Sequence, residues 1–312
     1  MLQMEVLKWV SPIPPSLDLM QEKRAVVMYS GGKDSTTVSI LVAEALKDGL
    51  IEADVEYVYA DTCVEIPPMR DWALSFLDEI KNAGFKIRVV KPKPSERFFA
   101  CLIGKGYPPP HYRFRWCTRR LKITPSEEAV KRAQVVVTGI RWGESRERDR
   151  VLRRACSRGG ECGSGVWMAR APKLGREYLA PIAEWNDCSV WRFLEEIAPL
   201  WGWPTECLRE LYGEGGLRFG CWVCTVVRRD NTLRRLGRKD PRMERLLRYK
   251  QYMLRVANWR KFPENRVWIN GTPRRLSLKA RRKLLDKLLK LEDKVGLELI
   301  SEEELLFIDK ML

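Results

Sequence analysis

Histidine is almost absent from this chain, since His111 is the only one among 312 residues. This scarcity excludes zinc sites built from several histidines and catalytic sites that need more than one, so a metal bound by side chains depends on cysteine and carboxylate. Long apolar runs are also missing, because none approaches the ~20 residues that span a bilayer. Residues 1–20 contain three prolines and no signal-peptide pattern. We therefore expect a cytoplasmic protein without a membrane partner.

The chain also lacks the character of a disulfide-stabilised secreted domain. It has nine cysteines, an odd number, and is long enough to bury a full core without cross-links. Apolar residues make up 45% of the sequence, which is typical of a globular protein. A change of composition near residue 200 predicts two domains, at 1–200 (core from about 22) and 201–312.

Acidic residues are scarce between 228 and 290, where 22 Lys and Arg accompany only 5 Asp and Glu. The net charge of the whole chain is +16, so the rest of the chain is close to neutral. A basic segment of this kind is typical of a polyanion-binding surface. The alternative is a set of solvated helix faces from a thermophile, but such faces usually balance the two signs of charge. We therefore predict that residues 228–290 bind nucleic acid, either DNA or tRNA.

Short apolar runs alternate with amphipathic stretches in the first half of the chain. We expect strands at 25–29, 55–60, 86–90 and 134–140 and helices at 36–47, 69–83 and 126–132. This alternation predicts an α/β fold with a doubly wound parallel sheet, in which ligands bind beyond the carboxyl ends of the strands. Residues 155–165 read as a loop. The chain beyond about 228 reads as mainly helical, with a leucine-rich basic helix at 277–291 and an acidic last helix.

Two glycines and a lysine follow the first expected strand. A glycine turn that enters a helix directs backbone N–H groups into one concavity, where the helix dipole adds positive potential. The spacing differs from the Walker pattern, which has four residues between its glycines. The sequence predicts a polyphosphate site made by Ser30, Gly31, Gly32, Lys33, Asp34 and Ser35.

Further clusters carry groups suited to phosphate, sulfate or metal. Asp61 follows the second strand, where a carboxylate can hold Mg²⁺. Cys117 lies among four cations within residues 115–122, and nearby cations lower the pKa of a thiol. Arginines within 139–148 can hold phosphate or sulfate bidentately. The Cys-x-x-Cys at 221–224 indicates a metal site, with structural zinc and a dithiol redox pair as the alternatives.

Residues 30–35 resemble the PP-loop of ATP pyrophosphatases, which cleave ATP between the α and β phosphates and adenylate a substrate. Together with the clusters at 61–65, 115–122 and 139–148 and Pro-Ile-Ala-Glu-Trp at 181–185, they resemble the phosphoadenosine-phosphosulfate reductase superfamily over roughly residues 22–200. The resemblance implies an ATP site that also involves Gly139, with bound Mg²⁺. It implies catalytic roles for Lys33, Asp34, Asp61, Arg141, Glu144 and Arg148.

The chain departs from parts of this superfamily. It has no Glu-Cys-Gly-Leu-His type motif, which carries the catalytic cysteine of phosphosulfate reductases, and no adjacent cysteine pair of the adenylylsulfate reductase type. Asp-Thr-Cys replaces the common Asp-Thr-Gly at 61–63. Residues 218–227 and the basic leucine helix are instead similar to the DNA sulfur-modification PP-loop proteins of phosphorothioation systems, which carry an iron–sulfur cluster.

On this resemblance Cys117, Cys221 and Cys224 hold a cluster of the 4Fe-4S type. Either Cys156 or Cys162 is the fourth ligand, or one iron stays open to hold sulfide. The other four cysteines are expected in the core: Cys63, Cys101, Cys188 and Cys207. The implied function is ATP-dependent sulfur transfer to nucleic acid, with a cysteine desulfurase or another sulfur donor as partner. The alternative is a phosphoadenosine phosphosulfate or adenylylsulfate reductase, or a sulfotransferase, that acts on a small nucleotide.

Overall fold

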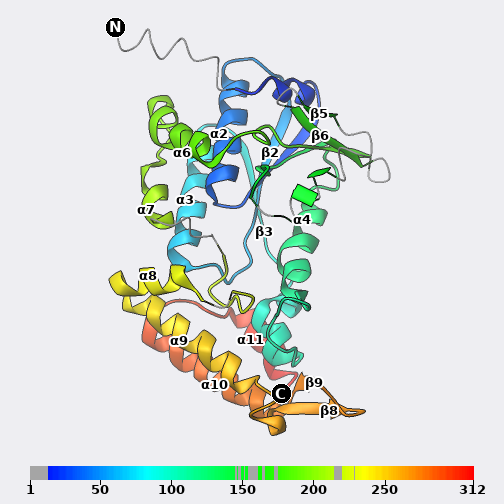
Figure 1. Cartoon of the computed structure of the whole chain (residues 1–312), viewed down its shortest axis with the longest axis vertical. Helices are drawn as coiled ribbons and strands as arrows, with labels where there is room; N and C mark the ends of the chain where they lie inside the picture. The colour runs from blue at the N-terminus through cyan, green and yellow to red at the C-terminus, as the bar shows by residue number, and fades with distance from the viewer. Residues whose placement is uncertain are drawn as a thin grey trace. The chain divides into compact units, whose positions relative to one another are not determined.

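The computed structural model describes most of the chain (Figure 1), namely residues 13–144, 146, 149–150, 152–153, 161–163, 166–171, 175–213, 220–227 and 229–312, with the backbone alone for 161–163 and 166–171. It divides into two compact units that interleave along the sequence. The first unit comprises Met1–Tyr59, Met69–Val89 and Glu128–Leu211, and the second comprises Ala60–Pro68, Val90–Glu127 and Tyr212–Leu312. No helix in the described ranges is long and apolar enough to cross a membrane. The domain boundary predicted at 200 stays a prediction.

A seven-stranded sheet forms the centre of the first unit, with the order β3-β2-β1-β4-β7-β6-β5. The strands from β3 to β7 are parallel, which confirms the predicted doubly wound α/β sheet. The strand bounds are β1 Arg24–Tyr29, β2 Asp54–Ala60, β3 Lys86–Val90, β4 Val135–Val137, β5 Glu161–Gly163, β6 Val166–Ala171 and β7 Arg176–Leu179.

Two strand predictions are corrected. The strand expected at 134–140 ends at Val137, because only its first residues pair with β1 and β7. The loop expected at 155–165 contains β5, which pairs antiparallel with β6 in the register Glu161↔Met168. A pairing partner of this kind is invisible in the Gly-, Ser- and Cys-rich composition of the segment.

The three helices expected in the first half of the chain lie close to their predicted positions, at α2 Lys33–Lys47, α3 Pro67–Asn82 and α4 Thr124–Ala129. Two further helices follow, α6 Asp187–Arg192 and α7 Glu206–Tyr212. Short 3₁₀ and π turns occupy Pro15–Met20, Pro94–Glu96, Ala100–Gly104, Thr118–Ile123, Phe193–Ile197, Pro199–Trp201 and Pro263–Asn265. Helix α2 begins three residues earlier than expected, because Gly32 is extended and Lys33 already has helical geometry.

The strand order creates one place where the chain changes direction across the sheet. From β1 the chain proceeds outward through β2 and β3, whereas β4 returns to the other side of β1 and leads on to β7. Loops that follow strands on the two sides of such a switch point separate and leave room for a ligand. The segments that follow β1 and β4 are therefore the positions at which this fold places a site.

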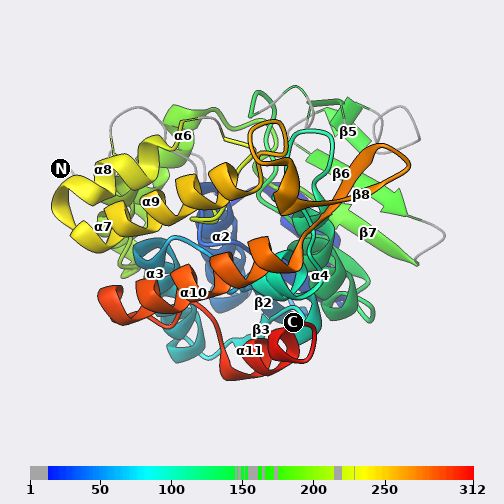
Figure 2. The ribbon, with the colours of Figure 1, turned by 90° about the horizontal axis from the view of Figure 1, so that it is seen from below.

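The second unit contains a helical layer and one β-hairpin (Figure 2). Its elements are α8 Asn231–Lys239, α9 Pro241–Val256, β8 Arg266–Ile269, β9 Thr272–Leu276, α10 Leu278–Val295 and α11 Glu302–Asp309. Buried leucines at helical spacing on α10, such as Leu284 and Leu288, face α9, whose Tyr249 hydroxyl donates to the Leu284 carbonyl at 3.1 Å. The predicted leucine-rich helix is thus present, whereas the hairpin was not predicted, although its turn, Asn270-Gly271, is a common hairpin sequence.

Glu304 is a buried carboxyl group in the second unit. It lies on α11 with 3% of its surface exposed and accepts the Ala100 backbone N–H at 2.8 Å. Burial raises the pKa of Glu304 to about 7, although Arg97 nearby opposes this shift. Because the folded state binds this proton more tightly than the unfolded state, Glu304 contributes stability at low pH and loses it as pH rises toward 7.

We expect Glu304→Gln to change the pH dependence of stability. The shift corresponds to ~3 kcal/mol, so the variant should gain roughly that amount relative to the wild type between pH 4.5 and pH 8. Melting temperatures across this range measure the effect, with the exposed neighbour changed in Glu302→Gln as the control. A constant difference in stability between Glu304→Gln and the wild type across this range would contradict the raised pKa of Glu304.

Candidate functional site

The loop after β1 has a fixed backbone that only glycine permits at one position. Gly31 has φ +75°, and a Cβ there would lie 2.7 Å from the Cβ of Ala73 on α3. The Gly31 carbonyl accepts the Trp72 indole N–H at 2.9 Å, which fastens the loop to the same helix. Ser35 Oγ donates to the Gly32 carbonyl at 2.9 Å. The loop therefore enters α2 in one defined conformation, with the helix N-terminus open to an anion.

Gly139 brings the segment after β4 against this loop. A Cβ at this position would lie 2.7 Å from the carbonyl carbon of Asp34 and 2.8 Å from the Ser35 nitrogen. Both atoms belong to the backbone, so neither can move aside cheaply. The absence of a side chain at Gly139 thus allows the next residues, including Arg141, to reach the start of α2.

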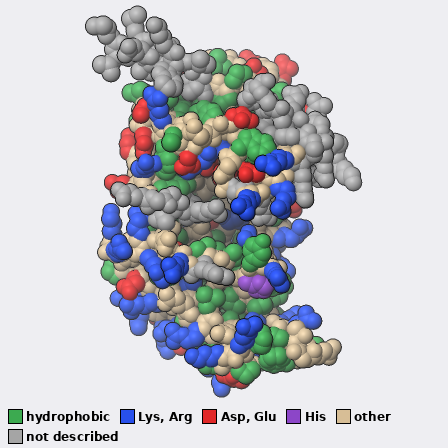
Figure 3. Space-filling model, viewed as in Figure 1, with side chains coloured by type: hydrophobic (Ala, Val, Ile, Leu, Met, Phe, Trp, Pro, Cys, Tyr) green, Lys and Arg blue, Asp and Glu red, His purple; other side chains and the backbone are tan. Residues whose placement is uncertain are grey.

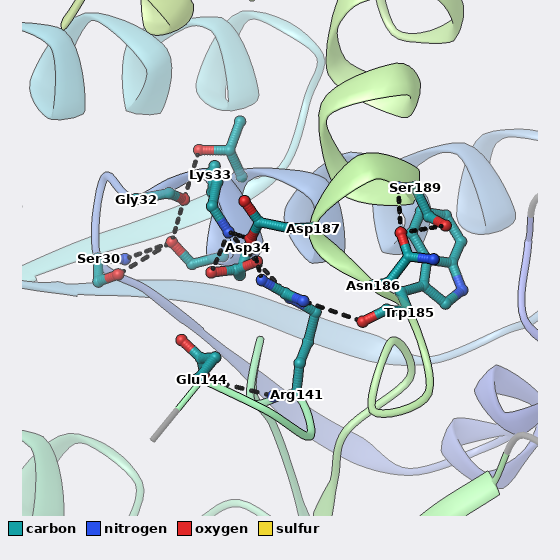
Figure 4. Close-up of polar contacts among 12 residues, drawn as sticks. Ser30, Gly32, Lys33, Asp34, Arg141, Glu144, Trp185, Asn186, Asp187 and Ser189 are labelled. Atoms are coloured by element: carbon teal, nitrogen blue, oxygen red, sulfur yellow. Dashed lines mark hydrogen bonds and ion pairs between the residues drawn. The ribbon is translucent and has the colours of Figure 1, made fainter. Parts of the chain in front are cut away.

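Arg141 is the centre of a charge network in the first unit (Figure 4). Its Nε donates to Asp34 Oδ1 at 2.6 Å and its Nη2 to Asp187 Oδ1 at 2.7 Å, while Nη1 donates to the Trp185 carbonyl at 2.9 Å. Lys33 Nζ lies 2.9 Å from Asp34 Oδ1 and 2.7 Å from Asp187 Oδ1. Two cations and two carboxylates thus share one small region at the carboxyl edge of the sheet.

The surroundings favour the charged forms of Asp187 and Arg141. Burial alone would raise the pKa of Asp187, but its hydrogen bonds to Lys33 and Arg141 outweigh burial and lower it. Burial likewise acts to lower the pKa of Arg141, and Asp34 and Asp187 reverse this effect. The Asp187 side chain is 61% exposed, against 17% for Asp34. Asp187 is therefore the partner that an arriving phosphate can displace with the least rearrangement.

The other predicted residues of the first unit lie beside the network or outside the described residues. Ser30 is exposed, and its backbone N–H donates to Ser35 Oγ at 3.1 Å. The Glu144 carboxylate accepts the Arg141 backbone N–H at 3.3 Å. Arg148 is outside the described residues. Asp187 was not predicted, because an Asp beside Asn186 at a helix start reads as part of an N-terminal cap.

Asp61 belongs to the second unit and is fully buried. Its Oδ1 accepts the Cys63 backbone N–H at 2.8 Å, and Lys91 Nζ lies 3.9 Å from its Oδ2. Cys63 has φ +62°, the conformation in which glycine is common, so Cys63 adopts it at a conformational cost. The carboxylate is thus held in place by its own turn.

Cys221 is held by a short backbone pairing in the second unit. Backbone hydrogen bonds join residues 220–222 to 64–66, and Cys221 lies opposite Glu65. The Cys221 sulfur lies 3.5 Å from Thr62 Oγ1. The indole of Trp222 is buried, and it anchors this turn in the core of the unit.

Cys117 and Cys224 are the other two described cysteines that the sequence assigned to the cluster. The Cys224 backbone N–H donates to the Cys221 carbonyl at 3.0 Å, so a tight turn joins Cys221 and Cys224. Burial raises the pKa of Cys117 and raises the pKa of Cys221 to about 11.

The lowered pKa expected for Cys117 is wrong. The prediction counted cations along the sequence, but burial is the largest influence on the pKa of Cys117, and Lys122 instead acts to lower the pKa of Cys221. Arg120 pairs with Glu96 and lies over the Tyr107 ring, 5.3 Å from its centroid. Burial therefore decides the direction of the shift, and the thiol has to lose its proton when it binds a metal.

In the part of the chain that the structure describes, no three His, Cys, Asp or Glu side chains are arranged to hold a metal ion. The assignment of Cys117, Cys221 and Cys224 as cluster ligands therefore stays a prediction. Of the proposed fourth ligands, Cys156 lies outside the described residues and Cys162 is described by its backbone alone.

The remaining cysteines divide into two kinds. Cys101 is buried as expected, and Cys63 is half-buried. Cys188 and Cys207 are exposed, so the core positions expected for them are wrong. Both lie on short helices, where apolar neighbours in the sequence do not show which side of the helix faces solvent.

Comparisons with known proteins were made on the sequence and on the structure. Residues 24–227 match the sequence profile of the phosphoadenosine phosphosulfate reductase domain. A search of curated proteins finds no match. Similar solved structures include the phosphoadenylyl-sulfate reductase of Candida auris in a phosphate complex (15% identity, 71% of this chain and 89% of that chain, TM-score 0.43). They also include the U34-tRNA thiolase NcsA of Methanococcus maripaludis with its [4Fe-4S] cluster (12% identity, 76% and 75%, TM-score 0.39).

We expect Asp187→Asn to strengthen the binding of inorganic pyrophosphate, because Lys33 and Arg141 each lose one competing carboxylate. The gain should be about 3- to 10-fold, measured by titration calorimetry at fixed salt. Glu184→Gln is the matched control, since it removes one negative charge from an exposed residue three positions away. Equal affinities of the two variants would contradict the competition between Asp187 and the anion.

Proposed function

Because this chain belongs to the phosphoadenosine phosphosulfate reductase domain family, we propose that it is an ATP pyrophosphatase of the PP-loop type that adenylates a nucleic acid for sulfur transfer. The observation that carries this proposal is that Lys33 and Arg141 lie side by side at the start of α2, where both contact Asp187 Oδ1 at 2.7 Å. Two cations next to a helix N-terminus suit a polyphosphate, which brings several negative charges to one place.

The residues of the first unit account for the adenylation step. An oxygen of the substrate attacks the α-phosphorus of ATP, the bond to the bridging oxygen breaks, and pyrophosphate leaves. Lys33, Arg141 and the backbone N–H groups of the loop stabilise the charge that develops on the leaving group. Asp34 keeps Arg141 in position throughout, since its carboxylate is less exposed than that of Asp187. Mg²⁺, when bound with ATP, would supply further charge neutralisation, and either Asp34 or Asp61 is its proposed ligand.

The second unit carries the groups for sulfur transfer. Cys117, Cys221 and Cys224 would hold the iron–sulfur cluster, which supplies an iron site for sulfide when bound. In the transfer, the sulfur of hydrosulfide bonds to the activated atom of the substrate. The bond from that atom to the adenylated oxygen breaks, and AMP is released. With hydrosulfide as the donor, no oxidation state changes. A persulfide from a cysteine desulfurase can replace hydrosulfide if a thiol reductant supplies two electrons.

The charge of the second unit supports a nucleic acid as the substrate. Lys and Arg side chains cover much of the face formed by α8 and α9 (Figure 3). Residues 228–290 hold 22 Lys and Arg against 5 Asp and Glu. A polyanion releases its counterions on such a surface, so binding should weaken steeply as salt is raised.

A second candidate function is chemistry on phosphoadenosine phosphosulfate or adenylylsulfate. The family match over residues 24–227 favours it, and the Arg141 guanidinium suits a sulfate as well as a phosphate. This candidate predicts tight binding of a sulfonated nucleotide and no requirement for a polynucleotide. The proposed function predicts the reverse for both properties.

We expect Lys33→Ala to lower the rate of AMP and pyrophosphate formation from ATP by ~10²- to 10³-fold, the usual effect of removing one charge-stabilising donor. Chromatography of the nucleotides measures the rate. Lys47→Ala is the matched control, because Lys47 lies at the other end of the same helix and pairs with Glu44. An unchanged rate in Lys33→Ala would remove the loop from catalysis.

We expect the protein purified without air to contain about four iron and four sulfide per chain. Single Ala variants of Cys117, Cys221 and Cys224 should lose both, together with the visible absorption band of the cluster. Cys188→Ala and Cys207→Ala are the controls, since both residues are exposed and lie in the first unit. Stoichiometric zinc, or iron that survives all three substitutions, would contradict the cluster assignment.

A further inference from the structure

The hairpin of the second unit exposes apolar side chains at its end. Strands β8 and β9 are joined by Asn270 and Gly271, which have φ +48° and +70° and form a tight turn. Val267, Trp268 and Ile269 directly precede the turn and are 43%, 43% and 52% exposed. Consecutive residues of a strand point to opposite faces, so both faces of the hairpin carry apolar groups in contact with solvent.

Two indoles form a fixed pair on this hairpin. The Trp268 ring packs edge-to-face against Trp259, with centroids 5.9 Å apart and planes at 85°. Trp268 Nε1 donates to the Pro263 carbonyl at 3.0 Å. Both indoles are nevertheless exposed, Trp259 by 39%. A tryptophan that is held in one orientation but open to solvent offers a flat surface on which another ring can stack.

The cations around the indoles point to an anionic partner. Between residues 255 and 285 the sequence has ten Lys and Arg and a single acid, Glu264. The Arg260 guanidinium lies 5.4 Å from the centroid of the Trp259 ring, and Arg274 and Arg275 are exposed on β9. A second copy of this chain would bring the same positive charge to the interface. A partner with negative charge and flat rings is attracted by these cations and can stack on the indoles.

We propose that the β8–β9 hairpin binds an unpaired stretch of a polynucleotide, with bases stacked on Trp268 and Trp259 and phosphates near the surrounding arginines. Bases inside a duplex are already stacked on each other, so only unpaired bases present a free face to an indole. This inference rests on the proposed action on nucleic acid. It adds that the substrate is engaged where its strand is single or opened.

The test compares binding of a labelled single-stranded oligonucleotide with that of the matched duplex, by fluorescence anisotropy at fixed salt. Trp268→Ala should weaken single-strand binding about 5- to 150-fold, the range for loss of one stacked base, and change duplex binding less than about 2-fold. Trp268→Phe should restore most of the affinity because it keeps a flat ring. Leu306→Ala, which changes another exposed apolar residue, on α11, is the control.

Further variants separate stacking from charge. The double variant Arg274→Ala, Arg275→Ala should weaken both nucleic acid forms and flatten their salt dependence. If circular dichroism shows that Trp268→Ala does not fold, Trp259→Ala serves as the second test. It should likewise weaken binding of the single strand more than binding of the duplex. The inference would be overturned if the tryptophan variants bound the single strand and the duplex with equally reduced affinity. It would also be overturned if the wild type were a dimer and the tryptophan variants were monomers.

The outcome also distinguishes this inference from the proposed function. If the wild type binds both nucleic acid forms and the tryptophan variants do not differ from it, only the role of the hairpin fails. If the wild type binds neither form while it still converts ATP to AMP, the nucleic acid substrate itself fails, and the hairpin inference fails with it.

Discussion

One guanidinium group joins three segments of the first unit at the carboxyl edge of its sheet. Arg141 comes from the segment after β4, and its partners come from the start of α2 and the start of α6. The group is only 5% exposed, so removing it from water is costly unless its donors are satisfied. Two carboxylates and one backbone carbonyl satisfy them. Arg141, together with the ion pair between Lys33 and Asp187, holds the PP-loop against the start of α6.

The network is better explained by ligand binding than by stability. Buried ion pairs often contribute little net stability, because desolvation offsets their attraction. Lys33 and Arg141 repel each other unless negative charge lies between them, and Asp34 and Asp187 supply it here. A polyphosphate can take over that role with more charge. The carboxylates thus keep two cations side by side and ready for an anion.

Local strings could be recognised in the sequence, whereas contacts between distant segments could not. The residues of the PP-loop and the arginine segment stood out because their chemistry is concentrated within a few positions. Asp187 did not stand out, because its role depends on how α6 meets the sheet. The exposed positions of Cys188 and Cys207 were missed for a related reason, since burial depends on the packing of the whole unit.

The hairpin and the cysteines of the second unit also depend on contacts that the sequence does not reveal. Residues 266–276 are basic and contain a proline, so no strand alternation marks β8 and β9 before their pairing is known. For Cys117 the sequence suggested an activated thiolate, but burial raises its pKa, and hydrogen bonds with Thr118 oppose this rise only in part. Residue types near a cysteine in the sequence therefore indicate a site without indicating its protonation.

The most direct test of the account is exchange of labelled pyrophosphate into ATP, catalysed by the protein with and without a polynucleotide. If the protein adenylates a nucleic acid, exchange should require both the polynucleotide and Lys33, because the adenylation is reversible while pyrophosphate is present. Exchange that proceeds equally well without any polynucleotide, or that occurs only with a sulfonated nucleotide, would contradict the account.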